Sequence, residues 1–375
     1  MPISILIKPA SSMCNMRCKY CFYADVSEHR SVKNHGIMSL GILETIVRSA
    51  FEYASDGPCN FAFQGGEPTM CGLDFYKYLI KFQDKYNTKK IPVTNAIQTN
   101  GYCINDNWAK FFADNNFLVG LSLDGPKNVH DLYRHDSAGK GTWNTVTNTA
   151  SLFNKYKVEF NILCVVNNIV AKKGASIYNF YKKNNFRYIQ FIPCLDSFDD
   201  DIVNDFSLDP KCYEDFLKTT FNLYYNDFKN NNYISIRTFD NYVSMILGQH
   251  PECCGMSGVC TSYFVIESDG SVYPCDFYVL DKYKMGNINT QNFSQLAKAE
   301  TAKTFVKQSY FVDDKCKKCK WLQICRGGCR RNREPMVDEK LSLNQFCTAY
   351  KNFFSYAADK LKEIAQIVYT NTKTT

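Results

Sequence analysis

Apolar and polar positions follow two rhythms along the N-terminal part of the chain. Short apolar or β-branched runs predict β-strands over residues 3–8, 60–63, 94–99, 118–123, 158–166 and 188–192. Amphipathic stretches between them predict helices over residues 41–54, 73–86, 107–115, 143–156 and 175–183. Strands that alternate with helices of this length favour a parallel sheet. Because six strands are predicted and not eight, we expect an α/β fold with a partial (β/α)6 TIM-like barrel over residues 1–232.

From about Tyr233 this rhythm stops and cysteines become dense. Beside Cys253, eight of them fall within 94 residues: Cys254, Cys260, Cys275, Cys316, Cys319, Cys325, Cys329 and Cys347. Such density predicts a small, metal-stapled domain over residues 233–348. Helical periodicity over residues 349–369 predicts that residues 349–375 form a C-terminal helix.

Composition limits the expected location and partners. The chain has no run of about 18 apolar residues, and its N-terminus lacks the basic and apolar segments of a signal peptide. We therefore expect a cytoplasmic protein with no membrane partner, in which clustered, reduced cysteines serve metal binding or catalysis. The net charge of +7 is spread along the chain without a basic block or an RNA-binding motif, so no nucleic-acid partner is expected.

Three cysteines follow the first predicted strand with the spacing Cys14-x3-Cys18-x2-Cys21. Thiolates are the usual protein ligands of iron–sulfur clusters. Three of them can hold three irons of a cubane, which leaves the fourth iron open to a small molecule that can take an electron. In β/α barrels the reactive groups lie on loops after the C-terminal ends of strands, where this loop falls. The alternative is a zinc knuckle, although zinc more often takes four ligands in two pairs.

The run Gln64-Gly65-Gly66-Glu67-Pro68 follows the second predicted strand, and its glycines let the backbone approach a ligand closely. This run and the three-cysteine loop together resemble the signatures of the radical SAM superfamily. The resemblance implies that Cys14, Cys18 and Cys21 hold a [4Fe–4S] cluster whose open iron binds S-adenosylmethionine (SAM).

The same resemblance implies further contacts with SAM. Gly65, Gly66 and Glu67 would hold its amino group, Tyr20 and Leu195 its adenine, and Ser122 and Arg134 its ribose and carboxylate end. Taken without the resemblance, Ser122 would be a turn residue at a strand end and Arg134 one half of a surface ion pair.

The cysteine-rich part resembles the SPASM extension of radical SAM enzymes, which binds two auxiliary [4Fe–4S] clusters. The resemblance assigns Cys254, Cys260, Cys275 and Cys329 to one cluster, and Cys316, Cys319, Cys325 and Cys347 to the other. Four protein ligands each would leave no open iron, so these clusters are expected to move electrons. Two zinc sites with the same ligands are the alternative. Cys253 could compete with its neighbour Cys254, and we expect the remaining cysteines to pack as small apolar residues.

Asp276 directly follows a predicted cluster ligand in Tyr273-Pro274-Cys275-Asp276-Phe277-Tyr278. A carboxylate that a cluster holds beside a substrate can act as a general base. Spacing alone favours a turn aspartate that bonds its own backbone, whereas the resemblance favours the base. Tyr23 is the rival proton acceptor, but an ordinary tyrosine pKa of about 10 makes it the poorer base.

Longer runs resemble the anaerobic sulfatase-maturating enzymes, among them the segments 7–12, 18–23, 61–69, 98–101 and 273–278. The resemblance implies a radical SAM dehydrogenase that oxidises Cys or Ser in a C/S-x-P-x-R motif to Cα-formylglycine, after hydrogen abstraction at Cβ by a 5′-deoxyadenosyl radical. The substrate would be an unfolded or nascent sulfatase polypeptide, and the electron donor a protein such as flavodoxin or ferredoxin.

Two other functions are weighed against this one. A maturase that cross-links or epimerises another ribosomal peptide often carries an N-terminal domain for a leader peptide, which we do not expect before a strand at residue 3. A non-catalytic electron-transfer or zinc protein would have no use for the Gly-Gly-Glu-Pro run. The sequence leaves open the client sulfatase, the preference for Cys or Ser, the reductant and the oligomeric state.

Overall fold

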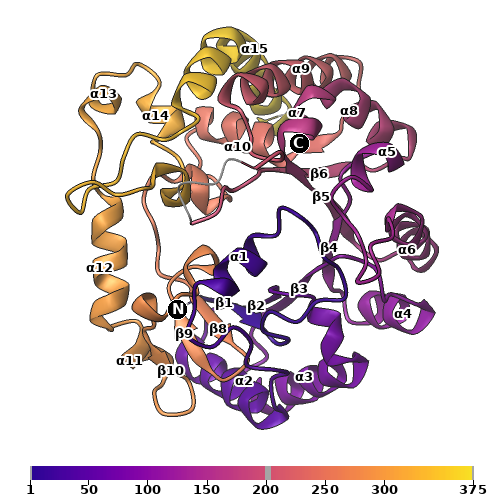
Figure 1. The fold of residues 1–375 in the computed structure, drawn as a ribbon, viewed down its shortest axis with the longest axis vertical. Coiled ribbons are helices and arrows are strands. Elements are labelled where there is room, and N and C mark those ends of the chain that lie inside the picture. Colours follow the sequence, from indigo (N-terminus) through magenta and orange to yellow (C-terminus); the bar gives the residue numbers. More distant parts are fainter. Residues whose placement is uncertain (1, 199–203, 374–375) are drawn as a thin grey trace. The chain divides into compact units, whose positions relative to one another are not determined.

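The computed structural model describes residues 2–198 and 204–373, which fall into two compact units (Figure 1). The first unit is made of Met1–Leu123, Asp131–Phe160 and Ser262–Phe305. The second is made of Asp124–His130, Asn161–Thr261 and Val306–Thr375. Both units combine segments from both halves of the chain, and the domain bounds expected from the sequence stay a prediction.

A mostly parallel sheet organises the first unit. Its strands are β1 (Ile3–Lys8), β2 (Cys59–Phe63), β3 (Val93–Thr99), β4 (Leu118–Ser122), β8 (Phe264–Glu267), β9 (Ser271–Tyr273) and β10 (Gly286–Asn287). In this unit their order is β10-β9-β8-β1-β2-β3-β4, with β8, β1, β2, β3 and β4 parallel. Figure 1 shows orange β8 beside indigo β1, although they are far apart in the sequence. The end of β1 is therefore flanked on both sides, and Lys8 lies in register with Glu267.

Helices cover this sheet and bury its apolar side chains. They are α1 (Phe22–Glu28), α2 (Leu40–Ala54), α3 (Leu73–Tyr86), α4 (Asp106–Asp114), α6 (Trp143–Tyr156) and α11 (Phe293–Leu296), while α12 (Glu300–Ser309) begins in this unit. Caps fix where several of them begin: the Ser39 hydroxyl accepts from the Ile42 N–H (3.3 Å) at α2. Helix α2 precedes the buried strand β2 and helix α3 follows it, so the loops at both ends of β2 are held in place.

The second unit has three parallel strands under a larger set of helices. The strands are β5 (Phe160–Val166), β6 (Tyr188–Pro193) and β7 (Ser235–Ile236). The helices are α5 (Lys127–His130), α7 (Asn168–Lys172), α8 (Gly174–Lys183), α9 (Pro210–Lys229), α10 (Arg237–Ile246), α13 (Asp314–Lys317), α14 (Leu322–Cys325) and α15 (Cys347–Lys373). Long helices α9 and α15 pack through aromatic rings such as Phe221 and Phe353, whose centroids are 5.5 Å apart.

The α/β fold built on parallel strands is confirmed. The predicted strands and helices of the N-terminal part all coincide with observed elements to within two residues. The expectation that the rhythm ends near residue 233 was wrong, because β7, α10 and β8 to β10 follow. These strands have only two to four residues, and all four positions of β8 are buried, so they show no alternating pattern.

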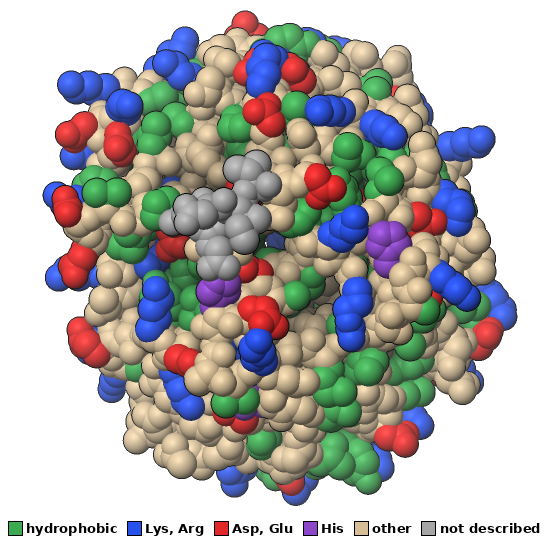
Figure 2. Space-filling view, viewed as in Figure 1, with side chains coloured by type: hydrophobic (Ala, Val, Ile, Leu, Met, Phe, Trp, Pro, Cys, Tyr) green, Lys and Arg blue, Asp and Glu red, His purple; other side chains and the backbone are tan. Residues whose placement is uncertain are grey.

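The structure also bears on membrane-spanning helices and on the distribution of surface charge. In the described part of the chain, no helix is long and apolar enough to cross a membrane. On the face seen in Figure 2, the basic side chains lie scattered among acidic ones.

Candidate functional site

The three-cysteine loop leaves the C-terminal end of β1 and is pinned by backbone hydrogen bonds. The N–H of Arg17 donates to the carbonyl of His135 (2.8 Å), and the N–H of Lys19 donates to that of Tyr133 (3.0 Å). Cys14, Cys18 and Cys21 are all half-buried. Burial raises the pKa of Cys14 to about 11, so a bound metal has to stabilise its thiolate form. Three thiols thus lie on one short, fixed loop, as a three-ligand cluster requires.

Two hydrogen bonds converge on the sulfur of Cys14. The backbone N–H of Met16 donates to it over 3.4 Å, and the side-chain amide of Asn100 lies 3.6 Å away. Hydrogen bonds to ligand sulfurs are among the factors that tune iron–sulfur potentials. The site therefore includes Asn100, at the end of β3, which the sequence did not single out.

The loop after β2 lies directly against the three-cysteine loop. The Glu67 N–H donates to the carbonyl of Met13 over 2.7 Å. A Cβ added at Gly66, whose φ is +51°, would lie 2.2 Å from that carbonyl oxygen, and one at Gly65 would lie 2.5 Å from Cε of Lys8. Gly66 lets the two loops approach this closely, whereas a side chain at Gly65 would displace that of Lys8 on β1.

Gly66→Ala is expected to dismantle the site, because the added methyl group collides with backbone atoms that cannot move aside. Gly36→Ala is the matched control: its φ is +75°, but nothing lies within 4 Å of the added Cβ. The control carries only the left-handed backbone cost of roughly 1–2 kcal/mol. Iron content and SAM binding after anaerobic reconstitution measure the difference. Equal iron and equal SAM affinity in both variants would contradict the close contact.

Glu67 connects the loops after β2 and β3. Its buried carboxylate accepts from the hydroxyls of Thr69 (2.7 Å) and Thr99 (2.8 Å) and from the backbone N–H of Asn100 (2.7 Å). Burial raises the pKa of Glu67, and these hydrogen bonds oppose that rise. Glu67 thus holds Asn100, and through it Cys14, in position. That Glu67 also contacts the amino group of SAM stays a prediction.

Three of the other residues predicted to contact SAM lie in the first unit. The Arg134 guanidinium lies 5.4 Å from the ring centre of Tyr20, and Ser122 accepts from the Gln98 amide over 3.1 Å at the end of β4. The backbone bonds of the segment around Tyr133 place Arg134 beside the three-cysteine loop, which contains Tyr20. Leu195 lies in the second unit, half-buried, just after β6. All four contacts with SAM stay predictions.

Asp276 is half-buried beside Tyr23 and Lys8 in the first unit. Its Oδ2 accepts from the Tyr23 hydroxyl over 2.6 Å. Its buried Oδ1 has no hydrogen-bond partner among the residues that the structure describes, and it lies 4.0 Å from Nζ of Lys8. Burial raises the pKa of Asp276, with Lys8 and Tyr23 opposing. Burial and the Asp276 charge hold the pKa of Tyr23 well above its usual range, so Tyr23 donates. One carboxylate oxygen is thus fixed by Tyr23, and the role of Asp276 as a general base stays a prediction.

Lys8 belongs to a buried chain of charges that the sequence did not reveal. Its Nζ lies 4.5 Å over the Tyr23 ring, and Lys8 is only 2% exposed. Glu267, which lies in register with Lys8 on the neighbouring strand, forms an ion pair with Arg30 at 2.5 Å. Burial raises the pKa of Glu267, but Lys8 and Arg30 outweigh it and hold the pKa below its usual range. The sequence offered one signal for this network, namely the lysine that ends the mostly apolar strand Ile3–Lys8.

Lys8→Met is expected to lower the free energy of unfolding by roughly 3–5 kcal/mol, because it leaves the Asp276 carboxylate without its cation and leaves Glu267 with Arg30 alone. Lys85→Met is the control: Lys85 also ion-pairs, with Glu44 at 2.7 Å, but it is 60% exposed. A solvated pair of this kind contributes little to stability. Anaerobic denaturant unfolding of the reconstituted variants provides the comparison. A loss no larger for Lys8 than for Lys85 would contradict the buried network.

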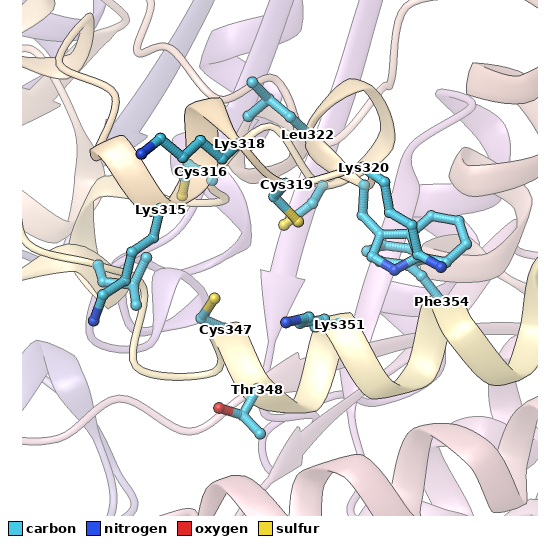
Figure 3. A pocket seen from close by; sticks show the side chains of 14 residues that line it. Lys315, Cys316, Lys318, Cys319, Lys320, Leu322, Cys347, Thr348, Lys351 and Phe354 are labelled. Carbon is cyan, nitrogen blue, oxygen red and sulfur yellow. The ribbon is translucent and has the colours of Figure 1, made fainter.

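A second group of cysteines surrounds a cavity of about 620 Å³ in the second unit. Its members are Cys316, Cys319, Cys325 and Cys347. In Figure 3 the sulfurs of Cys316, Cys319 and Cys347 point toward a common space. Among the described residues, no three His, Cys, Asp or Glu side chains form a site for a single metal ion. Four thiols around a cavity are the donor set that a closed [4Fe–4S] cluster takes.

The remaining predicted ligands fall into both units. Cys254, Cys260 and Cys329 belong to the second unit, whereas Cys275 belongs to the first. Burial, together with the charges of Cys254 and Cys260, raises the pKa of Cys329 to about 12. These three thiols are thus close enough to interact electrostatically. Their ligand role, like that of the other eight predicted cysteines, stays a prediction.

Two family profiles match the chain. The profile of the radical SAM superfamily matches residues 9–177, and that of an iron–sulfur cluster-binding domain, SPASM, matches residues 254–320.

Close relatives cover almost the whole chain. It is 51% identical over 365 residues to the cysteine-type anaerobic sulfatase-maturating enzyme of Clostridium novyi (strain NT), covering 97% of each chain. A serine-type anaerobic sulfatase-maturating enzyme of Bacteroides thetaiotaomicron is 32% identical, with 95% of this chain and 90% of that one covered. The solved structure of native anSMEcpe with bound AdoMet is 48% identical and superposes with a TM-score of 0.94, covering 97% of this chain and 100% of that chain.

Proposed function

The chain belongs to the anaerobic sulfatase-maturating enzymes of the radical SAM superfamily, and on that basis we propose that it oxidises the cysteine of a C-x-P-x-R motif to Cα-formylglycine. The near-complete likeness to cysteine-type relatives carries this proposal. Identity to cysteine-type enzymes is 49–51%, against 30–32% to serine-type enzymes, which favours Cys over Ser. The substrate is an unfolded or nascent sulfatase polypeptide.

The fold and cofactors expected from the sequence are confirmed at the level of the family. The radical SAM and SPASM domains imply a SAM-binding [4Fe–4S] cluster and auxiliary clusters. When bound, cluster and SAM supply a one-electron cleavage that yields a radical able to abstract hydrogen. The assignment of Cys14, Cys18 and Cys21 to this cluster is supported by their fixed loop at the end of β1.

The protein's own residues orient SAM and keep it in place. Glu67 and the two glycines before it form a rigid surface for SAM, because the backbone of this segment is packed against and hydrogen-bonded to the carbonyl of Met13. Tyr20 offers a buried ring for the adenine, and Leu195 its backbone. Arg134 offers a cation for the SAM carboxylate, and Ser122 a hydroxyl for its ribose.

Asp276 receives the proton of the substrate thiol at Oδ1. This role is supported by the lack of a hydrogen-bond partner for this oxygen among the described residues. Tyr23 fixes the other oxygen, and Lys8 balances the negative charge before the proton arrives. A base positioned in this way typically contributes about 10²–10⁴-fold to a rate.

The electron donor is a small redox protein such as flavodoxin or ferredoxin. Cytoplasmic location and the absence of nucleic-acid and membrane partners stay predictions. The cytoplasmic location is supported by the chemistry of the ligands, since free thiols persist in reducing compartments.

The proposal is tested with synthetic peptides under anaerobic conditions. Reconstituted enzyme receives SAM, dithionite and a peptide carrying C-x-P-x-R, with a twin carrying Ser at the same position. Mass spectrometry is expected to find the aldehyde on the Cys peptide at a higher rate than on the Ser peptide. Accumulation of 5′-deoxyadenosine with both peptides unchanged would overturn the assignment of the substrate and favour another ribosomal peptide.

A further inference from the structure

Lysines surround the cavity that Cys316, Cys319, Cys325 and Cys347 line. Its wall contains four lysines and no acidic residue: Lys315, Lys318, Lys320 and Lys351, which we call the lysine rim. All four are exposed. Three come from the segment around α13, and the fourth comes from the first turns of α15 (Figure 3). Segments separate in sequence therefore build one basic surface around a set of cluster ligands.

The nearby carboxylates do not cancel this charge. Asp314 pairs with Lys317, which lies outside the rim, at 2.8 Å. The Asp313 side chain caps α13 by accepting from the Lys315 N–H over 2.8 Å. No ion pair to a rim lysine is found within the described residues. The rim is a solvated cationic surface, which attracts an anionic partner over roughly a Debye length of 10 Å.

Lys351 and Lys315 of the rim interact electrostatically with Cys347, but they do so from exposed positions. Exposed ammonium groups are screened by water and salt. A buried cation already serves the cysteines: Arg333 is 4% exposed and interacts electrostatically with Cys316 and Cys325. The charge at the cavity mouth is therefore available to a partner.

We propose that the lysine rim docks an acidic one-electron carrier protein beside the second auxiliary cluster. The inference rests on the proposed function, because it needs a cluster at these four cysteines. Electron transfer requires close approach of the two redox centres, and a carrier seated on the rim would lie against the cluster's own cavity. Weak redox complexes bury little surface and depend on complementary charge for their rate of association.

The test uses a purified acidic flavodoxin and the reconstituted enzyme. Lys318→Glu/Lys320→Glu reverses two rim charges, and Lys77→Glu/Lys81→Glu on α3 is the matched control. Calorimetry at 25 and 200 mM salt measures the dissociation constant. We expect affinity to fall at least tenfold in the rim variant, to change less than twofold in the control, and to weaken with salt in the wild type.

Two further measurements separate docking from catalysis. Iron content and dithionite-driven formylglycine formation are expected to stay unchanged in the rim variant, because dithionite needs no docking. If the wild type makes no formylglycine, the proposed function fails, while the measured flavodoxin affinities still test the role of the lysine rim.

Unchanged flavodoxin affinity in the rim variant would overturn the proposal, as would equal weakening in the control. A rim-dependent dimer would instead assign the surface to a second copy of the chain. If the Glu variant loses iron, Lys318→Gln/Lys320→Gln is expected to weaken binding about threefold with iron retained, and unchanged affinity there would also overturn the proposal.

Discussion

Cys18→Ala is expected to abolish cleavage of SAM and to lower iron from about twelve to about eight atoms per chain, since one of three cubanes loses a ligand. Cys18 lies on the loop that the backbone of Tyr133 and His135 fixes in place. Iron analysis and chromatographic detection of 5′-deoxyadenosine after anaerobic reconstitution measure both effects.

Cys212→Ala is the matched control for this variant. Cys212 is also half-buried, but it lies on α9 of the second unit and belongs to no predicted ligand set. Its substitution is expected to leave iron content and SAM cleavage at the level of the wild type. SAM cleavage that persists in Cys18→Ala, or is lost in Cys212→Ala, would contradict the assignment of the three-cysteine loop.

Asp276→Asn is expected to reduce formylglycine formation at least about 100-fold while 5′-deoxyadenosine is still produced. The amide keeps the size of the side chain and can still accept from the Tyr23 hydroxyl, but it cannot take a proton from a thiol. Substrate oxidation is therefore uncoupled from the cleavage of SAM. The ratio of the two products, measured in one reaction, reports this uncoupling directly.

Asp281→Asn controls for the loss of a carboxylate in the same region. Asp281 accepts from the N–H of Ser31 over 2.8 Å and lies in a neighbouring turn. This variant is expected to keep the product ratio of the wild type. Loss of both products in Asp276→Asn would indicate a purely structural role, and an unchanged ratio would remove Asp276 from the proton transfer.

The strands, most helices and the cysteine spacing could be predicted because they depend on local patterns. Alternation of apolar runs identified β1 to β6, and short-range motifs identified the loops at the ends of β1 and β2. The surroundings of Asp276 could not be predicted in this way. They depend on pairs separated by 253 residues, for Tyr23 and Asp276, and by 237 residues, for Arg30 and Glu267. No local pattern specifies such pairs.

The lysine rim shows the same limit. In the sequence, residues 315–320 form a short charged segment that a solvated helix face would also produce. Only the packing of α15 brings Lys351 to the same cavity and sets these charges beside cluster ligands. The sequence therefore shows that these lysines are present, whereas only the fold shows that they surround one cavity.

The central claim is that this chain abstracts hydrogen from Cβ of a cysteine in C-x-P-x-R and delivers the thiol proton to Asp276. A peptide with deuterium on that Cβ tests it most directly. We expect one deuterium in each molecule of 5′-deoxyadenosine, and one formylglycine formed for each molecule of deuterated 5′-deoxyadenosine. In Asp276→Asn we expect 5′-deoxyadenosine to form with little or no formylglycine. Unlabelled 5′-deoxyadenosine accompanied by formylglycine would contradict abstraction at Cβ.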